Sequence, residues 1–228
     1  MLNLDDIGFA RNGFRLTADF QVPGPGITAV IGPSGGGKST LLSLIAGFET
    51  PDAGRILVNN QDITADPPGD RPVAILFQDN NLFPHLDVLA NVALGESPRV
   101  RPTPATLARS KDALSRVGLE GAEHRHPRDL SGGQQSRAAL ARILLTDRPV
   151  VLMDEAFSAL GPALRTDMLE LVKTLLPNAT ILMVTHDPED AKRIADHVIF
   201  VDGGTVEAPV ETDDFFANPH DALARYLT

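Results

Sequence analysis

Cysteine is absent from the 228 residues of the chain. Disulfide bonds and thiolate metal sites are therefore excluded, and the composition fits a protein of the reducing cytosol. Long apolar runs are also missing, because the longest ones, such as residues 150–153 and 180–184, have only the length of β-strands. The N-terminal segment MLNLDDIGFA has no basic stretch and carries early aspartates, so we expect no signal peptide. Any action at a membrane would then require a second chain.

Positive charge is in short supply. The 20 lysines and arginines are outnumbered by 30 aspartates and glutamates, which gives a formal net charge of -10. A nucleic-acid-binding surface needs clustered basic residues, so this balance argues against one. The length of the chain and its apolar content of 43% instead fit one ordinary globular domain, or a core domain with a small insert.

What is present is an alternation of short β-like runs with helical patterns, which is typical of an α/β domain. The candidate strands are residues 2–7, 15–21, 27–31, 55–58, 73–77, 150–153, 180–184 and 198–201. Four of these runs, the ones that begin at residues 27, 150, 180 and 198, are apolar throughout, as expected of parallel strands buried on both faces. The pattern predicts a doubly wound core.

Residues 83–144 differ from the rest because they contain no β-like run and have a mostly helical pattern. Pro98, Pro102 and Pro104 interrupt this stretch before a helix predicted at residues 105–117. We interpret residues 83–144 as a helical subdomain. It would be inserted into a catalytic core made of residues 1–82 and 145–228.

A glycine-rich stretch fits the phosphate-binding loop, or P-loop, of nucleotide-binding proteins. The candidate nucleotide-binding residues in it are Gly32, Pro33, Ser34, Gly35, Gly36, Gly37, Lys38, Ser39 and Thr40. Glycines let successive backbone N–H groups converge on phosphate oxygens, and the following helix N-terminus adds partial positive charge. Lys38 would reach the β- and γ-phosphates, and the Ser39 hydroxyl would bind Mg²⁺. A plain glycine-rich turn is the alternative, but the position between a strand and an apolar helix favours the nucleotide site.

Asp154 and Glu155 follow the apolar run at residues 150–153, where a buried strand would emerge at its C-terminal edge. Ligands bind at that edge in open α/β sheets. Asp154 suits Mg²⁺ binding, and Glu155 suits the polarisation of an attacking water as a general base. An acidic pair at the end of a strand is by itself usually a solvated loop. In a chain that also has a P-loop, a metal site is the favoured interpretation.

A second candidate phosphate site is the sequence Leu130-Ser131-Gly132-Gly133-Gln134, in front of a helix predicted at residues 135–145. Backbone N–H groups, a hydroxyl and a helix N-terminus would all attract an anion there. Taken alone, Ser-Gly-Gly is an ordinary helix N-cap. With the P-loop upstream and the acidic pair downstream, it resembles the signature motif of ABC transporter ATPases.

This resemblance covers nearly the whole chain and implies the fold of that family. The implied fold is a RecA-like P-loop NTPase core with an N-terminal antiparallel β subdomain and an inserted helical subdomain. The family works as a homodimer, in which the signature motif of one subunit closes on the ATP held by the P-loop of the other. The implied signature residues are Ser131, Gly132, Gly133 and Gln134. ATP and Mg²⁺ are the implied cofactors.

Two further residues match landmarks of the family. Gln78, after the run at residues 73–77, matches a glutamine that senses Mg²⁺ and the attacking water. His186, after the run at residues 180–184, matches a histidine that contacts the γ-phosphate. A lone histidine after a strand is otherwise more often structural. The resemblance thus gives Glu155, His186 and Gln78 catalytic roles, with Ser39, Gln78 and Asp154 at the metal.

Within the family, the chain is most similar to the ATPase subunits of bacterial thiamine importers. The similarity rests on residues 76–86, 91–95 and 157–165 and on the short total length. Importers of ferric iron, sulfate or polyamines share much of this pattern and stay open as alternatives. The resemblance implies a peripheral protein on the cytoplasmic face of the bacterial inner membrane. It also implies two partners, an integral-membrane permease and an extracytoplasmic substrate-binding protein, and no nucleic acid.

The expected permease contact is the segment Phe83, Pro84, His85 and Leu86, which would form an exposed apolar patch. We expect this patch to receive a short cytoplasmic helix of the permease. The alternative is that Phe83 and Leu86 pack inside the helical subdomain.

Three positions depart from the pattern of the family. Gly161 stands where an aspartate is usual at the dimer seam, and Ala156 stands where a proline is usual. Arg11 aligns with the usual adenine-stacking aromatic residue, and Phe9 and Phe14 lie close by. Either the Phe9 ring or the Arg11 guanidinium could stack on the base.

Three other functions use the same motifs. ABC ATPases that act on DNA ends or ribosomes usually carry long coiled coils or two fused cassettes, and this sequence has neither. An exporter ATPase would be distinguished by the permease with which it copurifies. A subunit that does not hydrolyse ATP is suggested only by Gly161.

Overall fold

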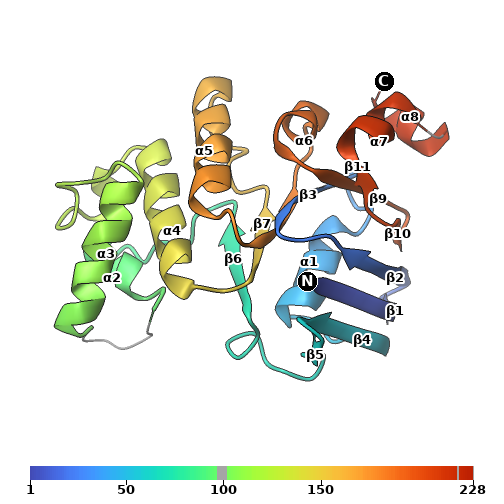
Figure 1. Cartoon of the computed structure of the whole chain (residues 1–228), viewed down its shortest axis with the longest axis horizontal. Coiled ribbons are helices and arrows are strands. Elements are labelled where there is room, and N and C mark those ends of the chain that lie inside the picture. Colours follow the sequence, from blue (N-terminus) through green and yellow to red (C-terminus); the bar gives the residue numbers. More distant parts are fainter. Residues whose placement is uncertain (97–101, 220, 228) are drawn as a thin grey trace. The chain divides into compact units, whose positions relative to one another are not determined.

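The computed structural model (Figure 1) describes residues 1–96, 102–219 and 221–227, and the chain crosses four times between two units. The first unit comprises Met1–Val73, Pro149–Glu155 and Asn178–Thr228. The second unit comprises Ala74–Arg148 and Ala156–Pro177. The predicted helical stretch at residues 83–144 falls within the second unit, which also contains residues 156–177.

The elements of the first unit form a mixed sheet with flanking helices. Its strands are β1 (Leu2–Arg11), β2 (Phe14–Val22), β3 (Gly26–Ile31), β4 (Ala53–Val58), β5 (Gln61–Asp62), β7 (Val150–Asp154), β8 (Thr180–Val184), β9 (His197–Asp202), β10 (Thr205–Val206) and β11 (Val210–Glu211). Its helices are α1 (Lys38–Ala46), α6 (Pro188–Ile194), α7 (Thr212–Ala217) and α8 (Asp221–Leu227). Along the sheet these strands follow the order β5-β4-β1-β2-β10-β9-β3-β8-β7, with β11 paired to β9.

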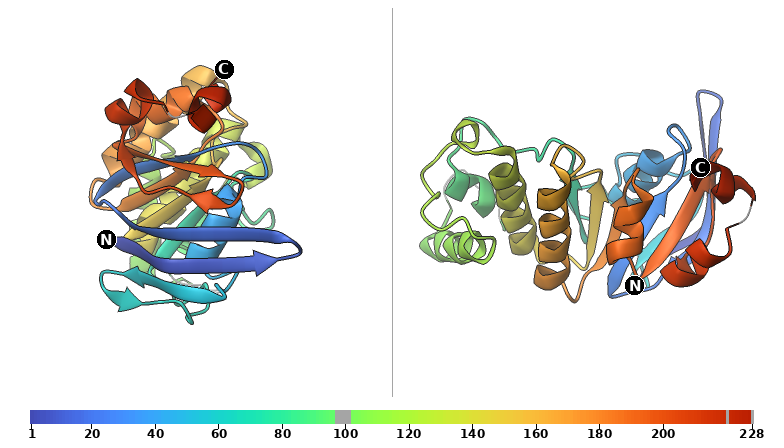
Figure 2. Two further views of the ribbon diagram at one scale, coloured as in Figure 1. Left: turned by 90° about the vertical axis from the view of Figure 1, so that its right-hand side faces the viewer. Right: turned by 90° about the horizontal axis from the view of Figure 1, so that it is seen from above.

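The antiparallel part of this sheet is built from β1, β2 and β4, as expected for the N-terminal region (Figure 2). Side chains along β2 alternate between buried and exposed, which is the period of a strand with one covered face. Asn12 and Gly13 join β1 to β2 with φ of 51° and 83°. Two positive φ angles are what a tight hairpin turn requires, and Asn-Gly is the sequence that favours it. The turn places Arg11 and Phe14 side by side at the tip of the hairpin.

The parallel part of the sheet confirms the prediction from the apolar runs. β9, β3, β8 and β7 are neighbours and run parallel. All five residues of β8 are buried, and so are the first four of β7. Because the strands are parallel, their C-terminal ends share one edge, and the segments that begin at Gly32, Glu155 and Thr185 leave the sheet there.

The second unit is mainly helical, as its sequence predicts. Its elements are β6 (Val73–Phe77), α2 (Val88–Ala93), α3 (Pro104–Arg116), the short 3₁₀ helix η1 (Pro127–Asp129), α4 (Gly132–Thr146) and α5 (Pro162–Leu175). Helices α2, α3 and α4 pack on one another. Pro104 opens α3 instead of interrupting the chain before it, because Thr103 caps the helix and proline suits its first turn. The predicted break at Pro98 lies outside the described residues.

Helix α4 begins at Gly132, before the predicted start at residue 135, because Ser131 caps it. The short elements α2, α6, α7, α8, β5, β10 and β11 were not predicted. None of the helices in the described part of the chain combines the length and the apolar character needed to cross a bilayer.

Candidate nucleotide site

The loop between β3 and α1 has the backbone geometry of a phosphate cradle. Gly32 has a φ of 145°, and a Cβ there would lie 2.0 Å from the carbonyl oxygen of Val201. Only glycine can occupy this position without moving the neighbouring strand β9. Gly37 has a φ of 117° and forms the N-cap of α1. The loop therefore delivers the chain into a helix N-terminus, as the sequence predicted.

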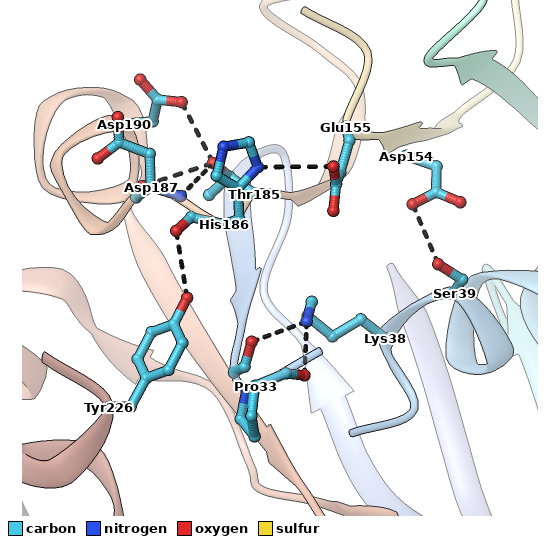
Figure 3. A network of polar contacts seen from close by, with 11 residues as sticks. Pro33, Lys38, Ser39, Asp154, Glu155, Thr185, His186, Asp187, Asp190 and Tyr226 are labelled. Carbon is cyan, nitrogen blue, oxygen red and sulfur yellow. Dashed lines mark hydrogen bonds and ion pairs between the residues drawn. The ribbon is translucent and has the colours of Figure 1, made fainter. Parts of the chain in front are cut away.

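Lys38 is bound by its own loop. Its Nζ atom donates to the carbonyl oxygens of Gly32, at 2.7 Å, and Pro33, at 2.9 Å (Figure 3). The residue is only 8% exposed. Burial lowers the pKa of Lys38, while the negative charges of Glu155 and Asp154 act in the opposite direction. The charged amino group of Lys38 is thus held beside the loop that would bind phosphate oxygens.

Ser39 and Asp154 form the second polar pair of the site. The Ser39 hydroxyl donates to Oδ1 of Asp154 at 3.3 Å. Burial raises the pKa of Asp154, and the hydrogen bond from Ser39 partly offsets that rise. A hydroxyl and a carboxylate are oxygen ligands of the kind that Mg²⁺ takes. The Ser39 hydroxyl and the Asp154 carboxylate thus lie together, and their chemistry fits a divalent ion.

Glu155 has a backbone conformation that is rare for a residue with a side chain. Its φ is 47°, and its N–H donates to the carbonyl oxygen of Val184 at 3.2 Å. Such a left-handed non-glycine residue stores strain, and such strain gathers at functional sites. The strained turn carries the side chain to the His186 imidazole, whose Nδ1 lies 3.5 Å from Oε2 of Glu155.

The segment after β8 is fixed by a small hydrogen-bond network. Thr185 Oγ1 accepts from the backbone N–H of Asp187 at 3.1 Å and donates to Oδ2 of Asp190 at 3.2 Å. The hydroxyl of Tyr226, from α8, donates to the carbonyl oxygen of His186 at 3.4 Å. The His186 side chain itself is 56% exposed and can therefore meet a ligand.

A cavity of about 590 Å³ lies over the phosphate loop and extends to the hairpin tip. Its lining residues are Phe9, Arg11, Phe14, Ser34, Gly35, Gly37, Lys38, Ser39, Thr40, Ser43, Glu49 and Glu155. This volume is in the range of small-molecule and cofactor sites. The cavity brings the predicted loop residues together with both candidates for base stacking, and with Ser43 and Glu49, which the sequence did not suggest.

Arg11 and Phe9 lie on the same side of β1 and touch each other. The Arg11 guanidinium carbon is 5.3 Å from the centroid of the Phe9 ring, and its Nη1 lies 3.0 Å from Oε2 of Glu49. Phe9 is only 6% exposed, whereas Arg11 is exposed. The guanidinium therefore has an aromatic ring and a carboxylate as its two neighbours. No local sequence pattern indicates the partnership with Glu49.

Gln78 lies in the second unit, where it follows β6 and is exposed. The next turn contains Asn80 and Asn81, with φ of 59° and 46°. Arg142, on α4, donates to the carbonyl oxygens of Asn81 at 2.7 Å and Asn80 at 2.9 Å. This arginine supports a strained turn directly after Gln78, and the sequence did not reveal it.

The predicted signature residues also lie in the second unit, at the start of α4. Ser131 is the N-cap, its Oγ accepts from the N–H of Gln134, and Gln134 Oε1 accepts from the N–H of Ser131. The ordinary N-cap interpretation is therefore correct as local structure. Ser131 and Gly132 are exposed and Gly133 is buried. A ligand could still reach the first turn of the helix.

The departures at Gly161 and Ala156 have different surroundings. Gly161 is the N-cap of α5, with φ −64° and ψ 156°, and a Cβ there would have no atom within 4 Å. Any residue could adopt this conformation, so nothing in the local structure requires glycine. Ala156 is buried, at 5% exposure.

Phe83, Pro84 and His85 are exposed, and Leu86 is half-buried. The buried side chain of Asn91 holds this segment, because it accepts from the N–H of Phe83 and donates to the carbonyl oxygens of Phe83 and Leu86. The Phe83 and His85 rings pack edge to face. Phe83 is 46% exposed, so its predicted exposure is confirmed and it does not pack in the core, whereas Leu86 is only partly exposed.

The parallel sheet with a glycine loop and an acidic pair at its C-terminal edge defines a P-loop NTPase fold. A protein-family model described as ABC transporter matches residues 17–158. The chain belongs to the ABC transporter family.

Curated relatives agree with this assignment over the full length. Thiamine import ATP-binding protein ThiQ of Mesorhizobium japonicum is 51% identical and aligns over 99% of this chain and 90% of its own length. The protein of the same name from Cereibacter sphaeroides is 52% identical and aligns over 100% of this chain and 99% of its own length. Among solved structures, the dimeric bacterial ABC transporter cassette MJ0796 matches with a TM-score of 0.78 and 27% identity, over 93% of this chain and 99% of that one. CbiO1 from Clostridium perfringens, part of the ABC transporter complex cbiONQ, matches with a TM-score of 0.82 and 26% identity. The match covers 95% of this chain and 90% of CbiO1.

Proposed function

We propose that this chain is the ATP-binding and ATP-hydrolysing subunit of an ABC importer for thiamine. One observation carries the enzymatic part: Lys38, Ser39, Asp154, Glu155 and His186 gather around one loop in the first unit. The curated relatives named for thiamine import, at about half identity over the full length, support the substrate.

The phosphates of ATP would bind in the loop between β3 and α1, with Lys38 at the β- and γ-phosphates. Its Nζ would exchange the two carbonyl partners of the loop for phosphate oxygens, which are stronger acceptors. The adenine would stack on Arg11. We prefer Arg11 to Phe9 as the stacking surface because the guanidinium is exposed and Phe9 is buried behind it.

Ser39 and Asp154 would hold Mg²⁺, and Gln78 would join them as a third oxygen ligand. When bound, Mg²⁺ neutralises charge on the β- and γ-phosphates. The pairing of Ser39 with Asp154, and the burial that raises the pKa of this carboxyl group, support the assignment. A bound cation would return that pKa to a lower value.

Glu155 would act as the general base for hydrolysis. Its carboxylate would accept a proton from the attacking water, whose oxygen forms the new bond to the γ-phosphorus while the bond to the bridging oxygen breaks. His186 would donate to the γ-phosphate. The contact between Nδ1 of His186 and Oε2 of Glu155 supports the participation of both residues in hydrolysis, because each side chain can orient the other.

Two copies of the chain would form the working dimer, with ATP between the P-loop of one and the signature segment of the other. The exposed Ser131 and Gly132 at the N-terminus of α4 support this arrangement, because their polar groups are open to a partner's nucleotide. The dimeric solved structure of a related cassette is consistent with it.

The permease would dock on the exposed segment of Phe83, Pro84 and His85. An apolar ring next to an imidazole, held on a rigid turn by Asn91, offers a firm surface for a short helix. The dimer would thus lie at the cytoplasmic face of the bacterial inner membrane as a peripheral component. An extracytoplasmic substrate-binding protein would deliver thiamine to the permease.

The decisive experiment reconstitutes the chain with its permease and binding protein in proteoliposomes. We expect thiamine-loaded binding protein to stimulate ATP hydrolysis and to drive thiamine uptake. The Lys38→Ala complex serves as the inactive control. Stimulation by sulfate, ferric iron or a polyamine with no response to thiamine would overturn the substrate and leave the ATPase role intact.

A further inference from the structure

Tyr226 reaches the candidate site from the C-terminal part of the chain. Its hydroxyl donates to the carbonyl oxygen of His186 at 3.4 Å. Its ring packs edge-on against Phe200 of β9, with centroids 5.9 Å apart. In Figure 3 the Tyr226 hydroxyl points toward the carbonyl oxygen of His186.

Burial raises the pKa of Tyr226, and the charges of Asp187 and Glu155 raise it further. The phenol therefore stays protonated at neutral pH and can donate to His186. One side chain connects Phe200, in β9, with the backbone of the residue after Thr185.

Two side chains hold the His186 segment. Thr185 fixes the turn next to α6 through Asp187 and Asp190. Tyr226 donates a hydrogen bond to the carbonyl oxygen of His186. The imidazole projects from this backbone toward Glu155, so a shift of the backbone moves Nδ1 relative to Oε2.

We propose that Tyr226 is a positioning residue, which holds the backbone of His186 at a fixed place relative to Phe200 of β9 and so aims the imidazole at Glu155 and the γ-phosphate. The inference rests on the proposed role of His186 in ATP hydrolysis. Tyr226 itself does not contact the reacting atoms.

The test is Y226F, which keeps the ring on Phe200 and removes only the hydroxyl. We expect kcat for ATP to fall by about 3- to 10-fold, the range that the loss of one neutral hydrogen bond allows. KM should change by less than about twofold, because the phosphate loop keeps the bonds from Lys38. The matched control is Thr212→Val, since Thr212 Oγ1 also donates to a backbone carbonyl, that of Ala195, at 2.7 Å. Its kcat should equal that of the parent.

A double-mutant cycle with His186→Ala decides whether Tyr226 acts through the imidazole. We expect Y226F to have no further effect on the residual kcat in the His186→Ala background. The same fold loss in both backgrounds would overturn the inference, because it would mean that the hydroxyl acts only on the fold. So would an unchanged kcat in Y226F. The parent must hydrolyse ATP, and His186→Ala must impair it; failure of either condition counts against the proposed function instead.

Discussion

The Nδ1 atom of His186 lies 3.5 Å from the Oε2 atom of Glu155, although the two residues follow different strands of the sheet. β7 and β8 are parallel neighbours with Asp154 opposite Val184, so the residues that follow them leave the same edge. The pairing of strands thus sets the pairing of the two candidate catalytic groups.

Glu155→Gln should keep ATP binding and lower the rate of hydrolysis by about 10²–10⁴-fold, the usual contribution of a general base. The variant should also accumulate as an ATP-bound dimer, since the nucleotide that joins the subunits is no longer cleaved. Phosphate release and size-exclusion chromatography with ATP measure both effects. Glu170→Gln, an exposed glutamate on α5, is the matched control. Near-parental turnover in Glu155→Gln would place the base elsewhere.

Lys38→Ala and Ser131→Arg should separate the two proposed phosphate sites. Lys38→Ala should abolish ATP binding by the monomer, because the loop loses the cation at its centre. Ser131→Arg should leave monomer affinity unchanged and prevent ATP-dependent dimerisation. Ser131→Ala controls for the lost helix cap, which by itself costs about 1 kcal/mol of stability. An equal loss of monomer affinity in both main variants would refute the role of Ser131 in the partner's site.

Asp154→Asn should raise the unfolding temperature at pH 7 in the absence of Mg²⁺ and ATP. Because burial raises the pKa of Asp154 above 3.8, the folded state favours the protonated carboxyl group. That stability is present below pH 3.8 and is lost as the pH rises through the folded pKa. Asparagine stays neutral, so it should keep the stability at pH 7.

Thermal unfolding monitored by circular dichroism at several pH values tests this expectation. The difference between parent and Asp154→Asn should shrink as the pH falls toward 4. Adding Mg²⁺ with ATP should stabilise the parent more than the variant. A parent that is the more stable of the two at pH 7 without ligand contradicts the prediction.

Gly161→Asp should fold and should increase the coupling between the two nucleotide sites. The position has an ordinary φ of −64°, free space for a Cβ and an N-cap role that aspartate fills better than glycine by a few tenths of a kcal/mol. With the permease present, we expect a larger Hill coefficient for ATP than in the parent. A Hill coefficient and a transport-to-ATP ratio equal to those of the parent would mean that Gly161 does not affect the coupling between the two nucleotide sites.

Phe83→Asp should abolish association with the permease and leave the fold unchanged, because the ring is exposed and its segment is held by Asn91. Copurification measures association, and circular dichroism measures the fold. Phe48→Asp is the matched control, since Phe48 is an exposed phenylalanine of the first unit, at 55%. An unfolded Phe83→Asp variant, or one that still binds the permease, counts against the docking surface.

The sequence was informative wherever a single segment determines its own structure. Buried parallel strands appear as continuous apolar runs, and the P-loop appears as glycines between a strand and a helix. The predicted strands at residues 27–31, 150–153 and 180–184 therefore match β3, β7 and β8 closely. Strands of two residues, such as β5 and β10, have no period of their own and form only because a longer neighbour pairs with them.

The parts of the site that were not predicted depend on contacts between distant segments. Glu49 meets Arg11 only because the segment after α1 and the tip of the hairpin converge. Arg142, on α4, supports the turn at Asn80 by donating to the carbonyl oxygen of that residue. Glu49 and Arg142 are charged residues of the kind found at ordinary surface positions, so no pattern along the chain distinguishes them. Local patterns locate the loop and the strand ends, and tertiary packing adds the residues that orient them.

Tyr226 is the single tyrosine in a chain without tryptophan. When the isolated protein is excited at wavelengths that phenylalanine does not absorb, its fluorescence therefore comes from one ring, and the hydroxyl of that ring donates to the carbonyl oxygen of His186. The chain carries a natural optical probe beside a residue of the candidate site, and changes in its emission can be followed in stopped-flow experiments without any attached dye.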